Sequence, residues 1–242
     1  MSRPLRWILI LAVLTLAAFI LRLPAALPAR WLPADISLAG LQGSVWQGSA
    51  AALGVKGLVT QEALRWQLQP RALLRGQLLW QISGTHAGRD SQLRLIAGFN
   101  GVAIEGLQLH LPLEPFTQFD PTAQGLRLRG DLQINSERLA PGQPIGLDAR
   151  LTRVSSAMAG EASALGGYQA RVDADAAGAG NVSISTLNGP LQIAGGGSFA
   201  LRARSVDLQL RLKPETDLPG LSPALATLPR EQDSYLLSIK QP

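Results

Sequence analysis

The chain has 242 residues, of which 46% are hydrophobic and 5% aromatic, and it carries a formal net charge of +5. This length suits one domain of ordinary to large size or two small ones, with a core built mainly of Leu, Val, Ile and Ala. There is no cysteine, which excludes disulfides, thiolate catalysis and cysteine-ligated zinc.

The first element along the chain is an uncharged apolar segment from Trp7 to Leu21, broken only by Thr15. Arg6 precedes it and Arg22 follows it. Its length of about fifteen residues is short of the roughly 20 that a membrane-spanning helix usually needs. The two flanking arginines can snorkel to the membrane surfaces, however, and so extend the usable length.

We predict that residues 1–6 are cytoplasmic and that residues 7–23 form a single transmembrane signal-anchor helix in the inner membrane. A linker over residues 24–36 then leads to a periplasmic β domain over residues 37–242. The positive charges before the apolar run favour a cytoplasmic N-terminus. A cleaved signal peptide is one alternative, but Ala26-Leu27-Pro28 places proline where cleavage needs a small residue. A buried core helix is the other, and it is disfavoured because the run is apolar on all sides.

From about residue 36 onward, apolar residues recur with a period of two, which is typical of β-strands. The clearest case is Gly125 to Ile134, where leucines alternate with arginines and other polar residues. Asn188-Gly189-Pro190 predicts a turn between two further strands. Strands are also predicted at Leu64–Leu68, Leu78–Ile82, Leu93–Ala97, Ile145–Leu151, Tyr168–Val172, Val182–Leu187, Leu191–Ala194 and Tyr235–Ile239.

The alternation slips by one residue at two places, Glu105-Gly106 and Arg204-Ser205. One extra residue in a long strand forms a β-bulge, so we predict a bulge at both places. A hairpin turn is the alternative at the second place, although Arg204-Ser205 lacks the Asn-Gly chemistry of a tight turn.

Helical signals are few. Residues 71–74 are too short to matter, residues 113–119 lie among prolines and are expected to form a loop, and residues 218–228 can give one or two helical turns. None of these segments could cover one face of roughly ten strands. We therefore predict an all-β fold, in which a strongly curved and twisted, mostly antiparallel sheet buries its own apolar face as a barrel, a sandwich or an open half-barrel. An outer-membrane barrel is disfavoured because aromatic girdles are missing.

Residues suited to catalysis or metal binding are scarce. The two histidines are His86, in a predicted loop over residues 83–88, and His110, in a predicted strand. They lie far apart, which makes a poor metal site. Gly195-Gly196-Gly197 opens no helix and so forms no phosphate cradle. We predict no catalytic, cofactor-binding or metal-binding residues, and no nucleic-acid partner, because the arginines alternate with apolar residues instead of forming a basic patch.

The most specific motifs follow the linker. Gly43-Ser44-Val45-Trp46-Gln47-Gly48 places a tryptophan between two glycines, and Leu64-Arg65-Trp66-Gln67-Leu68-Gln69-Pro70 brings a second tryptophan soon after. Glycine at such positions permits a bulge or a close approach of two backbones. The spacing would let Trp46 and Trp66 meet across adjacent strands. We interpret them as a packed corner of the core, with an exposed anchor for a partner as the alternative.

These motifs resemble the protein N family of the bacterial type II secretion system. In that family, a Gly-x-Val/Ile-Trp-x-Gly strand precedes a Leu-x-Trp-x-Leu-x-Pro strand and a Leu-rich stretch ending in Gly, which here is Leu73-Leu74-Arg75-Gly76. The motifs cover about residues 38–82, and the rest of the chain agrees in pattern and length. The resemblance implies a non-enzymatic accessory subunit, anchored in the inner membrane with its domain in the periplasm. Its implied partners are the inner-membrane platform subunits, protein C among them, and the outer-membrane secretin.

A lipid-handling module is the second hypothesis, because an anchored curved sheet with an aliphatic inner face resembles the lipid-carrier grooves of other envelope proteins. If the sheet stays open, its lining would be an exposed apolar surface suited to a ligand. A third hypothesis, an envelope hydrolase, lacks any triad or metal site to support it.

Overall fold

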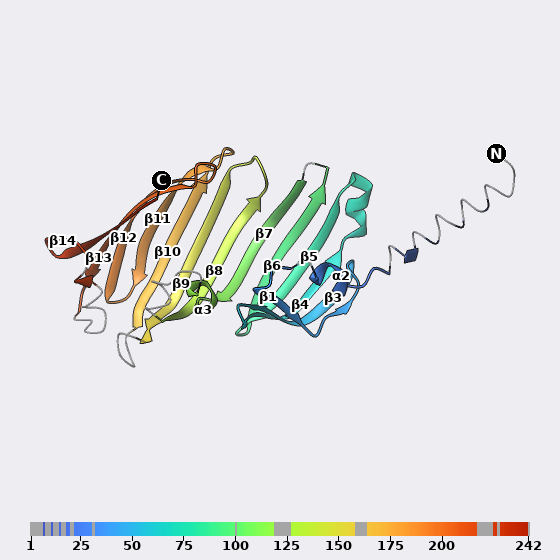
Figure 1. Cartoon of the computed structure of the whole chain (residues 1–242), viewed down its shortest axis with the longest axis horizontal. Coiled ribbons are helices and arrows are strands. Elements are labelled where there is room, and N and C mark those ends of the chain that lie inside the picture. Colours follow the sequence, from blue (N-terminus) through green and yellow to red (C-terminus); the bar gives the residue numbers. More distant parts are fainter. Residues whose placement is uncertain are drawn as a thin grey trace.

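The computed structural model describes residues 7, 11, 15, 18, 19, 22–30, 32–99, 101–118, 127–157, 164–216, 225, 226 and 228–241. Over these residues the chain forms one large antiparallel sheet (Figure 1). Its strands are β1 (Ile36–Ala39), β2 (Gln42–Gly43), β3 (Gln47–Val55), β4 (Leu58–Leu68), β5 (Leu78–His86), β6 (Arg89–Gly98), β7 (Gly101–Pro112), β8 (Leu128–Leu139), β9 (Ile145–Ser156), β10 (Ala164–Ala174), β11 (Ala179–Asn188), β12 (Leu191–Ala200), β13 (Ser205–Pro214), β14 (Arg230–Glu231) and β15 (Ser234–Gln241). The short helical elements are α2 (Ala26–Ala29), the 3₁₀ helix η1 (Pro70–Arg75) and α3 (Glu114–Thr117).

The sheet is a meander that does not close on itself. From β3 to β13 each strand pairs with the next strand along the chain, and β15 then follows β13. β1 and β2 both pair with β3 at one end, and β14 pairs with β15 at the other. The prediction of an all-β, antiparallel sheet is therefore confirmed, and of the three forms considered the sheet takes the open one.

The two faces of the sheet differ sharply in chemistry. Directly paired residues lie on the same face, so one row of partners can be followed from β15 to β7. On one face that row is entirely apolar or glycine, and it runs through Leu237, Leu210, Gly195, Ile184, Ala170, Ala149, Ile134 and Leu109. On the other face the neighbouring row is polar or glycine, and it runs through Ser238, Gln209, Gly196, Ser183, Arg171, Asp148, Asn135, Gln108 and, in β6, Gln92.

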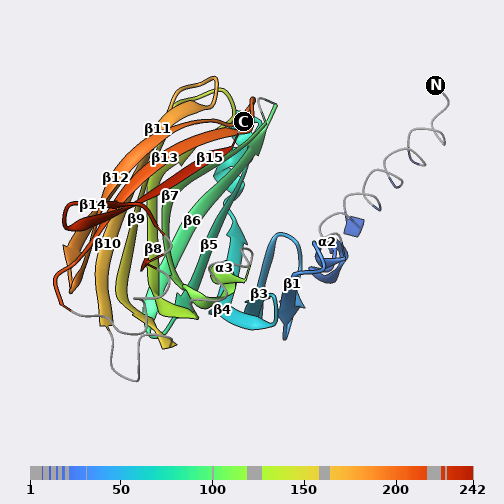
Figure 2. The same cartoon turned by 60° about the vertical axis from the view of Figure 1, so that its left-hand side comes forward.

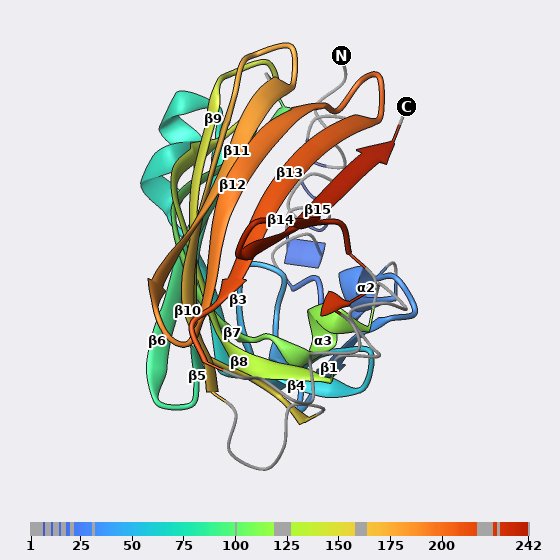
Figure 3. The same ribbon diagram turned by 90° about the vertical axis from the view of Figure 1, so that its left-hand side faces the viewer.

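The sheet curls around its apolar face. Figures 2 and 3 show the strands bent into a trough, with α3 inside the curve. Leu113, directly before α3, packs with Tyr168 and Leu191 of the apolar face, and Leu225 joins the same cluster. The concave face is therefore the apolar one. The cluster buries one end of the concave face, and its buried residues are Leu113, Val154, Leu165, Tyr168, Leu191 and Leu225.

The strand predictions hold, although most strands are longer than their patterns indicated. The turn at Asn188-Gly189-Pro190 separates β11 from β12 as predicted. The strand predicted from Gly125 to Ile134 corresponds to β8. Residues 125 and 126 lie outside the described residues, and β8 is described from Leu128. Residues 218–224, where helical turns were expected, also lie outside the described residues.

The first predicted bulge is confirmed and the second is wrong. Gly106 has a φ of +59°, and the pairing of β6 with β7 shifts by one residue there. At the second place, β12 ends at Ala200 and β13 begins at Ser205, so the alternative of a hairpin turn is correct. The amide of Arg204 donates to the Leu201 carbonyl at 3.3 Å, and Arg204 itself takes a φ of +53°. This four-residue loop needs no Asn-Gly pair because one arginine adopts the left-handed conformation.

Two smaller expectations also need correction. Residues 83–86 were expected in a loop, but β5 extends through His86 and turns only at Ala87-Gly88, where both φ angles are positive. Residues 113–119 were expected to form a loop, but Glu114–Thr117 make the single turn of α3.

The predicted membrane helix over residues 7–23 lies for the most part outside the described residues. Residues 7, 11, 15, 18 and 19 are helical, and Trp7, Leu11 and Phe19 are exposed. Among the described residues, no helix is both long enough and apolar enough to span a membrane.

Candidate interaction site

The glycine-flanked tryptophan motif forms the hairpin between β2 and β3. Gly43 pairs with Gly48, and the Ser44 amide donates to the Gln47 carbonyl at 2.8 Å. The Ser44 hydroxyl oxygen accepts the amide N–H groups of Trp46 and Gln47 at 3.3 and 3.2 Å. Gly43 has a φ of +87°, a conformation that glycine adopts without steric cost. The motif is therefore a turn held by its own serine.

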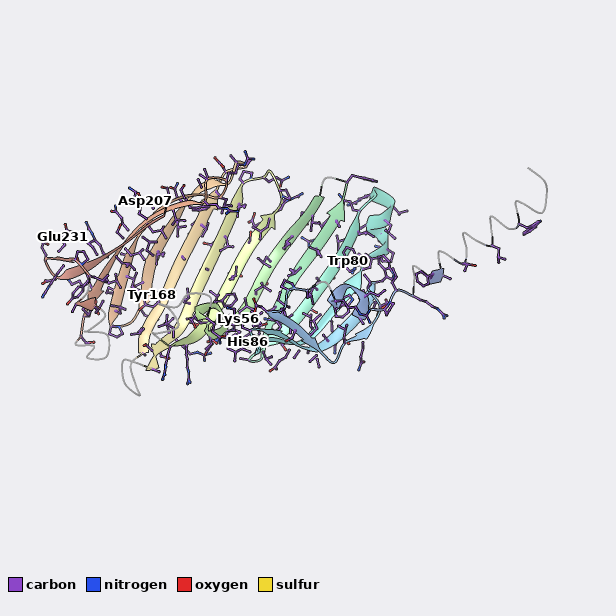
Figure 4. All side chains as sticks on the ribbon, in the orientation of Figure 1. Lys56, Trp80, His86, Tyr168, Asp207 and Glu231 are labelled. Carbon is purple, nitrogen blue, oxygen red and sulfur yellow. The ribbon has the colours of Figure 1, made fainter. Side chains whose placement is uncertain are left out.

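Three tryptophans from three elements gather on this turn. Trp46 stacks on Trp80 of β5, with ring centroids 6.3 Å apart and planes 7° from parallel. The indole N–H of Trp66 donates to the Ser44 carbonyl at 2.9 Å, and that of Trp80 donates to the Val45 carbonyl at 3.1 Å. Ser44, Val45, Trp46, Trp66 and Trp80 together are called the tryptophan corner below, and Figure 4 shows Trp80 at the N-terminal end of the sheet.

The tryptophan corner differs from the predicted contact between Trp46 and Trp66. Trp46 instead reaches across to Trp80, and Trp66 lies over Gly48, its direct partner in β3. A Cβ atom on Gly48 would lie 2.3 Å from Cζ2 of Trp66. The second glycine of the motif is therefore needed because it leaves room for an indole ring.

The predicted linker is tied to the tryptophan corner. The Val45 amide donates to the Leu23 carbonyl at 3.0 Å, and the Ala25 amide donates to the Gly43 carbonyl at 3.2 Å. Pro24 and Ser44 make an isolated antiparallel bridge between these two bonds, and Ala25 is buried. The chain is thus fixed to the sheet directly after residues 7–22.

A second set of polar contacts stabilises the curvature of the first strands of the sheet. The side-chain amide of Gln61 in β4 donates to the His110 carbonyl in β7, across the two strands between them. The Ser91 hydroxyl accepts the His110 amide at 2.9 Å, and Lys56 Nζ donates to the Gln118 carbonyl at 3.2 Å. Gln61 and Ser91 are buried. These bonds, called the polar clasp below, hold the N-terminal strands in a tight curve.

Both histidines have structural positions. His110 lies in β7, a strand as predicted, and its Nδ1 is 2.8 Å from the Asp90 carbonyl oxygen. His86 is the last residue of β5, at the turn. Among the described residues, no group of three or more His, Cys, Asp and Glu side chains could hold a metal ion. The carboxylates pair with arginines on the convex face instead. Glu105 bonds Arg138 at 3.1 Å and Arg94 at 3.5 Å.

Burial changes the acid–base chemistry of one tyrosine in the trough. The Tyr168 hydroxyl lies 2.9 Å from the Leu165 carbonyl and 3.1 Å from the Leu191 carbonyl, to either of which it can donate. Desolvation of this phenol raises the pKa of Tyr168 to about 12. On the convex face, the hydrogen bond and charge of Asp173 raise the pKa of Arg171 further above its ordinary value. Figure 4 shows Tyr168 in the C-terminal half of the sheet, far along the trough from Trp80.

The rest of the trough remains partly open to solvent. The apolar row from Leu109 to Leu237 contains no fully buried residue, although every member except Gly195 is at least half-buried. Elsewhere on the same face, Leu107 and Leu111 of β7 and Leu132 of β8 are also buried. The trough is therefore filled at one end and partly accessible along its middle. The alternation of apolar and polar residues alone could not distinguish such an open trough from a closed barrel.

Comparison with known proteins identifies the family of this chain. A family model described as protein N of the type II secretion system (T2SS) matches residues 34–238. The type II secretion system protein N of Vibrio cholerae serotype O1 (strain ATCC 39315 / El Tor Inaba N16961) is 29% identical over 150 residues, which are 60% of this chain. The match spans 59% of the length of that relative. No solved structure matches. The resemblance seen in the tryptophan motifs is confirmed, and the chain belongs to the protein N family of the type II secretion system.

Proposed function

We propose that this protein is a non-enzymatic accessory subunit of the type II secretion system. In this proposal, residues 7–23 anchor it in the inner membrane, residues 1–6 are cytoplasmic, and the β domain over residues 37–242 stands in the periplasm. There it contacts platform subunits, protein C among them, or the outer-membrane secretin. Membership of the family supports a role in protein secretion across the cell envelope.

One structural observation carries the proposal. The motif that marks the family is also the joint between the sheet and the segment preceding it, because Val45 and Gly43 bond Leu23 and Ala25. Such a joint sets the position of a large sheet relative to whatever residues 7–22 attach to. A scaffold needs this fixed geometry, whereas a flexible tether would leave the sheet free to reorient.

Two measurements test the proposal. Deletion of the gene should abolish secretion of the cargo while cell growth and membrane insertion of the other subunits continue. Photo-crosslinking in intact membranes, with the reactive group placed on the convex face at Ser183, Gln209 or Gln108, should capture platform subunits, protein C or the secretin. Normal secretion after deletion would contradict the proposed role in secretion. A protein found in the soluble fraction after cell breakage would contradict the membrane anchor.

The open trough favours a second candidate function, the binding of a lipid acyl chain. A row of partly exposed aliphatic side chains runs across the middle of the concave face. Exposed apolar surface of this length is costly in water, and an acyl chain would cover it. The ligand in this case would lie along the trough, and the filled end around Tyr168 would limit its depth.

Neighbouring residues of β11 provide a matched test of lipid binding. Ile184 lies on the concave face and Ser183 on the convex face. The full-length protein should retain phospholipid through purification, as seen by native mass spectrometry. Ile184→Arg should lose it by about tenfold, while Ser183→Arg should retain it. Absence of lipid from the wild-type protein, prepared in a detergent that does not compete for the trough, would exclude this function.

A further inference from the structure

The two edges of the open sheet are not equivalent. At the N-terminal edge, β1 has four residues, its first amide donates to the Pro33 carbonyl, and the segment after Leu23 covers β2 and its turn. At the C-terminal edge, β15 has eight residues, and among the described strands its outer side pairs only with β14, at Ser234 and Tyr235. Natural proteins usually shorten or cover such edges, because unpaired backbone groups can pair with another chain.

The hydrogen-bonding direction along β15 follows from one bond. The Leu236 amide donates to the Pro229 carbonyl, on the side away from β13. In an antiparallel strand, alternate residues direct their N–H and C=O groups to the same side. Ser238 and Lys240 therefore direct their backbone groups outward, while Leu237 and Ile239 bond β13 through their pairing with Leu210 and Leu208.

We propose that the outer side of β15 from Leu236 to Gln241 is a strand-addition site for an extended segment of another secretion subunit. This inference rests on the proposed function and names the surface that carries it. Main-chain bonds to Ser238 and Lys240 would supply the affinity, and alternate side chains would supply the selectivity. The added strand would place aliphatic residues beside Leu237 and Ile239 on the concave face, and polar residues beside Ser238 and Lys240 on the convex face.

Charge favours a different protein over a second copy of this one. The Lys240 side chain is 78% exposed, and its Nζ lies 3.4 Å from the Asp207 carboxylate. An acidic residue in the added strand would complement it. A second copy of β15, paired antiparallel about Ser238, would instead place Leu236 opposite Lys240, and each chain has a formal net charge of +5. The expected occupant is therefore an extended, alternating segment with a carboxylate on its polar face.

The backbone direction gives a sharp pair of variants. Ser238→Pro removes an N–H that points outward, so every bond to β13 remains, while Ser238→Ala keeps that N–H and removes only the hydroxyl. The probe is a synthetic octapeptide that alternates valine with glutamate and serine, and a matched peptide carries lysine in place of glutamate. We expect the acidic peptide to slow amide hydrogen exchange at residues 238 and 240 of the full-length protein by at least tenfold.

In the same experiment, the lysine peptide should protect these amides several-fold less, and Ser238→Pro should abolish the effect that Ser238→Ala retains. Equal weak exchange protection with both peptides would overturn the proposal. So would protection that rises with protein concentration in the absence of peptide, because it would identify a second copy as the occupant. The comparison of the two peptides on the wild-type protein remains decisive if Ser238→Pro does not fold.

Secretion in cells separates this inference from the proposed function. If deletion abolishes secretion, Ser238→Pro should lower it at least tenfold and Ser238→Ala should leave it unchanged. If deletion abolishes secretion but a folded Ser238→Pro variant secretes normally, the strand-addition site alone is overturned. Normal secretion after deletion would overturn the proposed function as well.

Discussion

The indole rings of Trp46 and Trp80 lie nearly parallel, although Trp46 precedes β3 and Trp80 belongs to β5. Both rings are partly buried, and the Trp80 N–H also donates to the carbonyl of Val45. The pair therefore joins the family motif to the third strand of the meander, and Trp66 joins the same turn to the strand between them.

Removal of either stacked ring should destabilise the sheet. Truncation of a fully buried tryptophan costs about 3–5 kcal/mol, and because both rings are only partly buried we expect Trp46→Ala and Trp80→Ala to cost about 2–3 kcal/mol each. A double-mutant cycle should give a coupling of about 0.5–1.5 kcal/mol. Chemical denaturation of the full-length protein measures these values. Leu74→Ala is the control, since Leu74 is 90% exposed, and additive single-variant losses would contradict the stacking.

Gly48→Ala should destabilise the protein more than an alanine at an open glycine. The new Cβ would lie 2.3 Å from Trp66 and 2.5 Å from the Gln42 carbonyl, and overpacking of this kind costs about 1–3 kcal/mol. Gly146→Ala is the matched control in β9, because its nearest contact is the Asp173 carboxylate at 3.8 Å. Thermal unfolding of both variants checks this. A Gly48→Ala variant as stable as Gly146→Ala would show that Trp66 does not occupy this space.

Sequence alone could predict the strands because each strand has one solvated and one apolar face. Leu210 and Gln209, for example, alternate as neighbours and belong to the two opposite rows of the sheet. The bulge at Gly106 could also be predicted, since an inserted residue moves every later side chain to the other face. The loop at Arg204 could not, because a left-handed arginine leaves no compositional signal.

The tryptophan corner and the polar clasp depend on curvature, which alternation does not specify. Trp46 meets Trp80 and Gln61 meets the His110 carbonyl only because the first strands bend tightly around the concave face. Gln61 looks like an ordinary polar strand residue in the sequence. Its burial becomes visible only when β4 is seen opposite β7.

Gln61→Glu should destabilise the protein in a pH-dependent way. The substitution replaces the amide that donates to the His110 carbonyl with a carboxylate, which would face that carbonyl in a buried position. Loss of the buried hydrogen bond to His110 and burial of a charge should together lower the free energy of unfolding by about 3 kcal/mol or more. Because burial raises the pKa of such a carboxyl group, protonation should restore part of the stability as the pH falls. Denaturation midpoints across pH 4.5–8 measure the effect.

The control for this variant is Gln81→Glu, since the Gln81 side chain is exposed on the convex face of β5. It should change stability by less than about 0.5 kcal/mol and show little pH dependence. If Gln61→Glu behaves like Gln81→Glu, the polar clasp does not hold β4 against β7.

Tyr168→Phe should remove both a hydrogen bond and a pH dependence. Loss of the bond from the phenol to Leu165 or Leu191 costs about 0.5–1.5 kcal/mol. Burial raises the pKa of Tyr168 from 10.0 to about 12 in the folded protein, so folding favours the protonated phenol. Its contribution is fully present below pH 10 and declines as the pH rises from 10 toward 12. Denaturation of the full-length protein at pH 8, 9, 10 and 11 should therefore show the wild type losing stability faster than Tyr168→Phe above pH 10. Parallel pH profiles for the two proteins would contradict the burial of this hydroxyl at the filled end of the trough.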